Sequence, residues 1–396
     1  MAEEYKSYID QVVDENIDHY WDLALDIHAN PEIAMKEVRT HDVCVADLEA
    51  AGFEVESNCE GAPTAFVATY KNGEGPTVGI FAELDALPIG HACGHNLITT
   101  SALLSGVAAK AAMEKHDIKG TLKVYGCPAE ESIGGKIIML EEGIFEGLDI
   151  ALLMHPTSAT SRIEAECCSA GDVFLSFKGR AAQPKTHPED GINAMDAMTL
   201  THMGIALHRY KLPDDTRIND VVLEMSKIPN SVPELARQQV EISSLSLAHL
   251  YESIEMVKRV AEGAAHATMC ELETEVEVGY FGRVRNETIG NVMREELIAV
   301  GEPMLEGFHM DMGGEDFGNV SRVIPGNMMY ISINPEKKIS GHTELFRQKA
   351  ASEDGRHCLY VSGKALARAA LVFMQDEELI AKAKAELAER IAAEQS

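Results

Sequence analysis

Residues 82–96 concentrate side chains that could do chemistry. The stretch reads Ala-Glu-Leu-Asp-Ala-Leu-Pro-Ile-Gly-His-Ala-Cys-Gly-His-Asn, and it holds two carboxylates, two histidines and a cysteine between two apolar segments. A core strand needs none of these groups, and a surface loop rarely concentrates them. Thiolate, imidazole and carboxylate are the ligands that a zinc-type ion prefers. The stretch therefore predicts a catalytic metal centre in a loop that follows a strand.

Cys93 and His95 lie two positions apart, so in an extended loop their side chains can face one cavity. Further candidates follow other apolar runs or lie in one later loop: Glu130, Glu131, His155 and His342. An adjacent pair of glutamates can divide the work, because one can bind metal while its neighbour acts as general base on a metal-bound water.

Each candidate also has an ordinary structural explanation. A lone Cys93 is more often a buried apolar thiol than a ligand. A lone His155 after a core strand is usually a hydrogen-bonded structural histidine, and a Glu-Glu pair is most often a solvated helix start that the helix dipole favours. Their joint occurrence at successive strand ends is what favours a site.

The chemistry needs elements that bring these residues together, and the surrounding pattern indicates an α/β fold. Expected strands at 78–81, 120–126 and 150–154 alternate with helices, and each is followed by polar candidates. The carboxyl edge of such a sheet is where sites are built. Residues 353–391 are rich in Ala, Leu, Glu and Lys, and we expect them to be helical.

The character of the chain changes near residue 168. From there to 283 the pattern is strand, helix, strand, strand, helix, strand, which predicts an open-faced α+β sandwich. The α/β pattern then returns. We expect a catalytic domain, residues 1–167 and 284–396, interrupted by an inserted domain, residues 168–283.

Composition limits the partners of this chain. Its 396 residues are enough for two domains, and 45% apolar with 25% charged residues is ordinary for a globular protein. The 64 acidic and 34 basic residues give a formal charge of -30. Nucleic acid and anionic membranes are disfavoured as partners, because their phosphates would be repelled.

The location is also constrained by the sequence. The N-terminus is acidic and polar with no apolar signal region behind it, and no apolar run approaches the ~20 residues that span a bilayer. The eight cysteines are scattered without regular spacing. A disulfide scaffold is not expected at this length, so we expect a reducing cytoplasm.

Residues 90–96, with Asp-Ala-Leu-Pro at 85–88, resemble the signature of the co-catalytic metal amidohydrolases and peptidases. This family includes aminoacylase, hippurate hydrolase and the plant auxin-conjugate hydrolases. The short spacing between the two motifs is most similar to the branch with the aminobenzoyl-glutamate hydrolase B subunit and the β-alanyl-lysine dipeptidase-like proteins. The resemblance extends along nearly the whole chain, through residues 28–32, 191–194 and 341–343.

The resemblance implies a metal-dependent exopeptidase-like α/β catalytic domain with an inserted lid that also mediates dimerisation. It implies one or two divalent ions, zinc or manganese first, with cobalt or nickel as alternatives. Glu130 matches the general base that activates the bridging water and later protonates the leaving amine, and Asp85 matches an acid that orients the site. The implied metal ligands are Cys93, His95, Glu131, His155 and His342.

Several positions depart from the family pattern. Gln183 stands where the family usually has a His that reaches across the dimer to the oxyanion. Gln183 can donate a hydrogen bond but carries no positive charge. The loss of an oxyanion donor lowers the rate by about 10²–10³-fold. His187 is an alternative donor. Asn219 stands where relatives often have His, and the strand near Ser244 lacks the Arg that commonly binds a substrate carboxylate. Asn96 stands where many relatives have Asp, which weakens the inference of a second ion.

These observations lead to competing hypotheses. The favoured one is a metal-dependent hydrolase of an amide bond in an N-acyl amino acid, an aminobenzoyl-glutamate-like conjugate or a dipeptide, acting as a homodimer. The alternative is a weakly active or non-catalytic subunit of a hetero-oligomeric amidohydrolase that depends on a partner for lid residues. A structural metal site in a binding protein is least favoured, because a closed shell has no use for Glu130 as a spare base.

Overall fold

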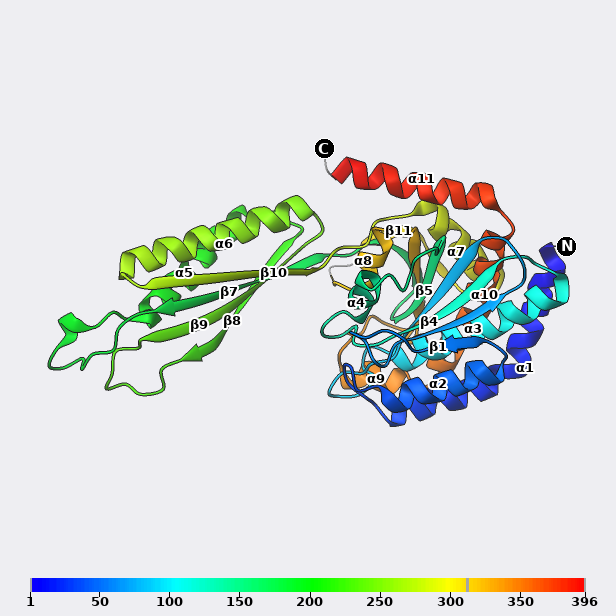
Figure 1. The fold of residues 1–396 in the computed structure, drawn as a ribbon, viewed down its shortest axis with the longest axis horizontal. Coiled ribbons are helices and arrows are strands. Elements are labelled where there is room, and N and C mark those ends of the chain that lie inside the picture. Colours follow the sequence, from blue (N-terminus) through cyan, green and yellow to red (C-terminus); the bar gives the residue numbers. More distant parts are fainter. Residues whose placement is uncertain (1, 311–312, 395–396) are drawn as a thin grey trace. The chain divides into compact units, whose positions relative to one another are not determined.

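The computed structural model describes residues 2–310 and 313–394, and its ribbon is shown in Figure 1. The chain forms two compact units. The large unit comprises the described residues up to 166, those from 283 to 310 and those from 315 to 394. The inserted unit comprises residues 167–282 with Gly313 and Gly314. The roles that the sequence predicts for the two units stay predictions.

An eight-stranded sheet forms the centre of the large unit, in the order β1-β2-β4-β3-β5-β12-β6-β11. β3 pairs in parallel with β4 and with β5, and β5 pairs in parallel with β12. The carboxyl ends of these four strands therefore meet at one edge. The strands are β1 (Glu54–Glu56), β2 (Phe66–Lys71), β3 (Thr77–Glu83), β4 (Thr121–Cys127), β5 (Ile150–Thr157), β6 (Ser161–Glu166), β11 (Met304–Met310) and β12 (Gly326–Ser332).

Helices cover both faces of this sheet, so its central strands are apolar throughout. Within β3, Ile80 belongs to the core beneath α1, α3 and α10, whereas Phe81 belongs to a second core with Phe145 and Phe317. The helices are α1 (Ala2–Ala29), α2 (Val38–Ala50), α3 (His95–His116), α4 (Gly135–Glu141), α7 (Glu287–Ala299), α8 (Phe317–Ser321), α9 (Glu344–Lys349), α10 (Glu353–Met374) and α11 (Glu377–Glu394).

The inserted unit is a four-stranded antiparallel sheet with two helices packed on one face (Figure 1). Along β7, Val173, Leu175 and Phe177 alternate toward these helices, where they form a core with residues such as Val257. The predicted α+β sandwich is confirmed. Its elements are β7 (Ser169–Lys178), α5 (Ala194–His208), β8 (Thr216–Met225), β9 (Leu235–Ser244), α6 (Leu247–Thr268) and β10 (Glu271–Tyr280).

The structure differs from the sequence pattern in two places. The helical region 353–391 is two helices, because α10 ends at Met374 and the side chain of Asp376 accepts a hydrogen bond from the Leu379 N–H at the start of α11. Strands β6 and β11 have no clear sequence signal. In the structure their parallel pairing is irregular, and Gly307 in β11 has a positive φ of 80°. Within the described residues, no helix is both long enough and apolar enough to cross a membrane.

Candidate metal centre

The loop between β3 and α3 delivers Cys93 and His95 to the carboxyl edge of the sheet. Gly94 between them has a φ of 82°, and a Cβ there would lie 2.8 Å from Cγ of Pro156. Only glycine fits both the left-handed backbone and the close approach of β5. The local turn that presents the two candidate ligands therefore depends on this residue.

A first group of candidate ligands consists of Cys93, His95 and His155, whose ligand atoms all lie within 4.8 Å of one another. The Cys93 Sγ is 3.4 Å from Nε2 of His155. Nδ1 of His155 lies 2.7 Å from the carbonyl oxygen of Pro156, and Nδ1 of His95 lies 2.8 Å from that of Asp85. Since Nδ1 donates in both rings, each Nε2 keeps its lone pair for an ion.

A second group consists of Cys93, Glu131 and His342, also within 4.8 Å. The Oε2 of Glu131 is 3.4 Å from Nε2 of His342. His342 comes from a distant loop, and its N–H donates to the carbonyl of Ala92 at 3.0 Å, which ties that loop to the residue before Cys93. The two groups share the Cys93 thiol.

Asp85 connects the loop after β3 to the segment after β4. Its Oδ1 accepts from the Glu130 N–H at 3.1 Å and its Oδ2 from the Glu131 N–H at 3.0 Å. Its Oδ1 also lies 3.2 Å from Nδ1 of His95. Outer hydrogen bonds of this kind orient metal ligands, so Asp85 lies where it can position three of the candidates.

The charged forms of these side chains are shifted by burial and by one another. Burial raises the pKa of Glu130 well above its ordinary value, and the charges of Glu83 and Asp316 act in the same direction. Burial also works to raise the pKa of Glu131, but the hydrogen bond with His342 and the charges of His95 and His342 together outweigh it and lower that pKa to about 2. Burial raises the pKa of the Cys93 thiol, so its thiolate needs a cation nearby.

The residues present fit a divalent cation. The Nε2 of His95 and the Oε1 of Glu131 are buried without a hydrogen-bond partner among the described residues, and they lie 3.7 Å apart. Buried polar atoms of this kind are costly unless something binds them. Sulfur, imidazole nitrogen and carboxylate oxygen together form a donor set that zinc-type ions accept.

Other predicted positions lie outside these groups. Gln183 is an exposed residue of the inserted unit, and its Oε1 accepts from the Lys185 N–H at 2.6 Å and the Thr186 N–H at 3.1 Å. His187 is exposed beside Glu189 and Asp190. Neither Gln183 nor His187 is a member of the two metal groups described above.

Asn219 and Ser244 also belong to the inserted unit. Asn219 is exposed on β8, while Ser244 is buried and donates to the carboxylate of Asp215 at 3.3 Å. Asn96 contributes to neither metal group. Its amide donates to the carbonyls of Ala24 and Ala350, so it joins α3 to neighbouring segments.

The sequence pattern does not predict a role for Glu83, Lys136 or Asp316. Glu83 is the last residue of β3, and with His95 and Glu130 it forms a third group within 4.8 Å. Lys136 contacts Glu83 and Asp316 through its ammonium group. The available signals were the position of Glu83 inside the 82–96 stretch and a lysine soon after the Glu-Glu pair.

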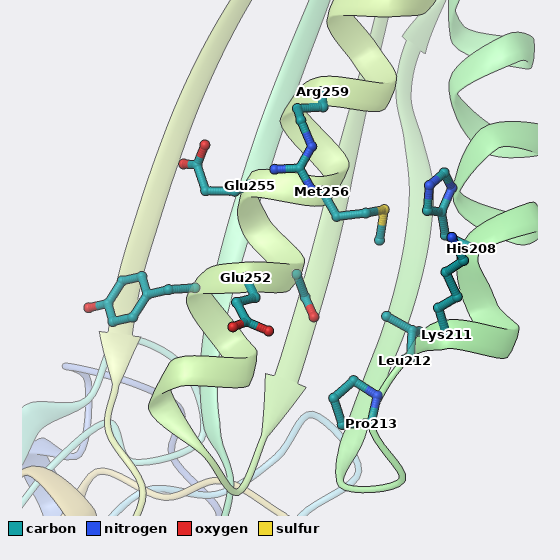
Figure 2. A pocket seen from close by; sticks show the side chains of 10 residues that line it. His208, Lys211, Leu212, Pro213, Glu252, Glu255, Met256 and Arg259 are labelled. Carbon is teal, nitrogen blue, oxygen red and sulfur yellow. The ribbon is translucent and has the colours of Figure 1, made fainter. Parts of the chain in front are cut away.

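A separate cavity of about 580 Å³ lies in the inserted unit, between α6 and the end of α5 (Figure 2). Its lining includes two basic side chains, Lys211 and Arg259, and two acidic ones, Glu252 and Glu255. Charges of both signs balance there, and the cavity contains none of the candidate metal ligands.

The chain is similar to enzymes that hydrolyse amide bonds. Residues 82–361 match Peptidase family M20/M25/M40. The Xaa-Arg dipeptidase of Mus musculus is 30% identical over 379 residues, covering 91% of this chain and 86% of the relative. The B subunit of the p-aminobenzoyl-glutamate hydrolase of Escherichia coli K12 is 30% identical over 322 residues, covering 76% of this chain and 66% of the relative.

Solved structures share the fold. A dinuclear metal binding peptidase of the M20 family from Bacillus subtilis has a TM-score of 0.75 at 21% identity, covering 91% of this chain and 99% of that one. The aminobenzoyl-glutamate utilization protein of Klebsiella pneumoniae has a TM-score of 0.70 at 19% identity, covering 93% of this chain and 99% of that one. The chain belongs to Peptidase family M20/M25/M40, and it is a hydrolase that acts on amide or peptide bonds.

Proposed function

We propose that this hydrolase is metal-dependent and cleaves the amide bond of an N-acyl amino acid, an aminobenzoyl-glutamate-like conjugate or a dipeptide. The observation that carries the proposal is the pair of ligand groups that share Cys93, with Glu130 beside them. Similarity to a dipeptidase and to one chain of an aminobenzoyl-glutamate hydrolase supports this substrate range.

In this proposal the ligands would be Cys93, His95, Glu131, His155 and His342. One or two divalent ions held there supply Lewis acidity toward a water and toward the scissile carbonyl. Zinc or manganese suits the mixed donor set, and cobalt or nickel is the alternative.

Glu130 is the proposed proton carrier. Its Oε2 lies 3.7 Å from Nε2 of His95, so its carboxylate borders the same space as the ligands. It would accept the proton of the attacking water and pass it to the leaving nitrogen. Asp85 would fix the positions of Glu130 and Glu131, because its carboxylate accepts hydrogen bonds from their backbone N–H groups.

Gln183 is the proposed donor to the oxyanion of the tetrahedral intermediate. Two backbone N–H groups donate to its side-chain oxygen, so its amide NH₂ is the part of the side chain that would donate to the substrate. An amide donor can stabilise developing negative charge without carrying charge itself.

The proposed assembly is a homodimer formed through the inserted unit. β8 is an edge strand with Val221, Val222 and Leu223 exposed, and α5 exposes Leu200 and Leu207. A hetero-oligomer is the alternative, since one relative is named as a subunit. The proposed compartment is a reducing cytoplasm, in keeping with eight free cysteines.

The test is the variant Glu130→Ala with a panel of N-acyl amino acids, aminobenzoyl-glutamate and dipeptides. Loss of a general base lowers turnover by about 10²–10⁴-fold, while metal content by elemental analysis should match that of the wild type. Glu146→Ala, an exposed carboxylate after α4, is the matched control. Unchanged turnover in Glu130→Ala would contradict the assignment, and robust turnover by the purified chain alone would exclude dependence on a second kind of chain.

A further inference from the structure

Glu83, at the end of β3, is a buried carboxylate that the proposed mechanism does not use. Its relative exposure is 1%. Its Oε1 accepts from the Lys136 ammonium at 2.7 Å. Its Oε2 has no hydrogen-bond partner among the described residues, and it lies 3.4 Å from Nε2 of His95.

Lys136 and Asp316 fix the orientation of this carboxylate. The Lys136 ammonium is fully buried and lies 2.5 Å from Oδ1 of Asp316, and the Lys136 N–H donates to Oδ2 at 2.8 Å. A lysine and one aspartate would balance each other. Glu83 adds a further carboxylate, so the trio would carry one excess negative charge with all three groups ionised, and such a charge is costly inside a protein unless a cation offsets it.

Two potential ligand atoms face each other here. Nδ1 of His95 lies 2.8 Å from the Asp85 carbonyl oxygen, so Nε2 is the ring atom that faces Oε2 of Glu83, and an ion that replaces the Nε2 proton would lie between two electron-pair donors. The Oε2 of Glu130 lies 3.7 Å from the same Nε2. Such an arrangement is stable when a positive charge lies between the donors.

We propose that Glu83 is a further metal-binding carboxylate, which adds an oxygen beside Nε2 of His95, and that Lys136 and Asp316 are its positioning residues. The inference rests on the proposed function, because it takes these residues to bind ions. It makes the surroundings of the two ions unequal, because Glu83 lies within 4.8 Å of ligand atoms of His95 and Glu130, whereas the group of Cys93, Glu131 and His342 does not include it.

This difference has a chemical meaning. A zinc ion with more protein ligands is held more tightly, whereas a catalytic ion keeps an open position. The ion that His95 binds would therefore be the more tightly held one.

The experiment removes all metal with a chelator and then titrates the apoprotein with Zn²⁺ by calorimetry, with elemental analysis of the dialysed protein. In Glu83→Gln, Lys136 keeps its contact with Asp316, and native circular dichroism would show that the fold is retained. We expect the tighter of the two zinc sites to weaken by about 10–100-fold, with the weaker site unchanged. Glu302→Gln, another buried carboxylate of the large unit, should bind zinc as the wild type does.

Glu83→Asp supplies the second variant. It keeps the charge beside Lys136 but is one methylene shorter, so the oxygen is withdrawn from His95. The inference predicts that it also weakens the tighter site, even where Glu83→Gln does not fold. Wild-type zinc affinity in the folded variants would overturn the inference alone, whereas a wild-type protein that takes up no ion would overturn the proposed function with it.

Discussion

Cys93 is the residue on which both ligand groups depend, because each includes its thiol. In Cys93→Ser the hydroxyl replaces a thiolate, which is the softer ligand that zinc-type ions prefer. We expect both ions to be lost on dialysis and turnover to collapse, measured by elemental analysis and amide hydrolysis. Cys270→Ser changes another half-buried free thiol and should leave both unaffected. Retention of two ions in Cys93→Ser would show that the thiol is not shared.

Gln183 tests whether the inserted unit contributes to catalysis. Gln183→Ala removes the proposed oxyanion donor, and we expect kcat to fall by about 10²–10³-fold with little change in metal content. Gln183→Glu keeps the size and the acceptor but not the donor, so it should be at least as impaired. His187→Ala is the comparison, since His187 is the other candidate donor. Normal kcat in Gln183→Ala together with loss in His187→Ala would move the role to His187.

Spacing along the chain predicts proximity for only some residues of the site. Cys93 and His95 are neighbours across one glycine, so a shared cavity follows from the chain itself. Glu83 has the same carboxylate chemistry as its neighbour Asp85, yet its role follows from Lys136 and Asp316, which the fold brings to it from distant segments. No local pattern encodes that contact.

The turn at Gly94 is the element that sets the geometry of the first group. Gly94→Ala would place an L-residue at a φ of 82° and a Cβ 2.8 Å from Pro156. The left-handed backbone alone costs about 1–2 kcal/mol, and the clash adds to it. We expect a lower melting temperature and weaker zinc binding. Gly147→Ala is a matched control, because Gly147 has a φ of 76° with nothing within 4 Å of its Cβ position, so zinc binding should not change.

A histidine contact joins α10 to the segment after α7. Nε2 of His357 lies 2.8 Å from the Glu302 carboxylate, and this hydrogen bond raises the pKa of His357 above 6.5. A raised folded-state pKa means that the stabilisation is fully present below the unfolded value and is lost as pH rises through the folded value.

His357→Gln should therefore lower the free energy of unfolding more at about pH 5.5 than at about pH 9. The difference should stay below about 1 kcal/mol, because the histidine is half exposed and water screens the pair. Urea unfolding at the two pH values measures it. Equal losses at both would mean that the charge of His357 does not contribute.

Element boundaries were predictable where apolar periodicity is strong, as along β7 or through the core strands β3 and β5. The boundaries were not predictable where a polar side chain determines the end of a helix. The break between α10 and α11 depends on one Asp376 cap within a sequence of good helix formers. β6 and β11 exist because they extend a sheet whose other strands are already in place, which is a tertiary effect that outweighs local propensity.

At the scale of the whole molecule, the two edges of the sheet in the inserted unit differ sharply. β10 carries Glu271, Glu273, Glu275 and Glu277, and charged edges of this kind oppose pairing with another chain. β8, the other edge, instead exposes Val221, Val222 and Leu223. If the protein is a homodimer, the contact should therefore form along β8.

Val222→Lys places a charge on the apolar edge, and we expect it to convert the dimer to a monomer in sedimentation velocity, because an unpaired buried ammonium is costly in an interface. Val276→Lys on β10 is the matched control and should stay dimeric. If the proposed oxyanion donor Gln183 acts across the dimer, the monomeric variant should lose turnover while it retains its metal. A monomer with wild-type turnover would show that each chain is complete, and a Val222→Lys protein that stays dimeric would place the interface elsewhere.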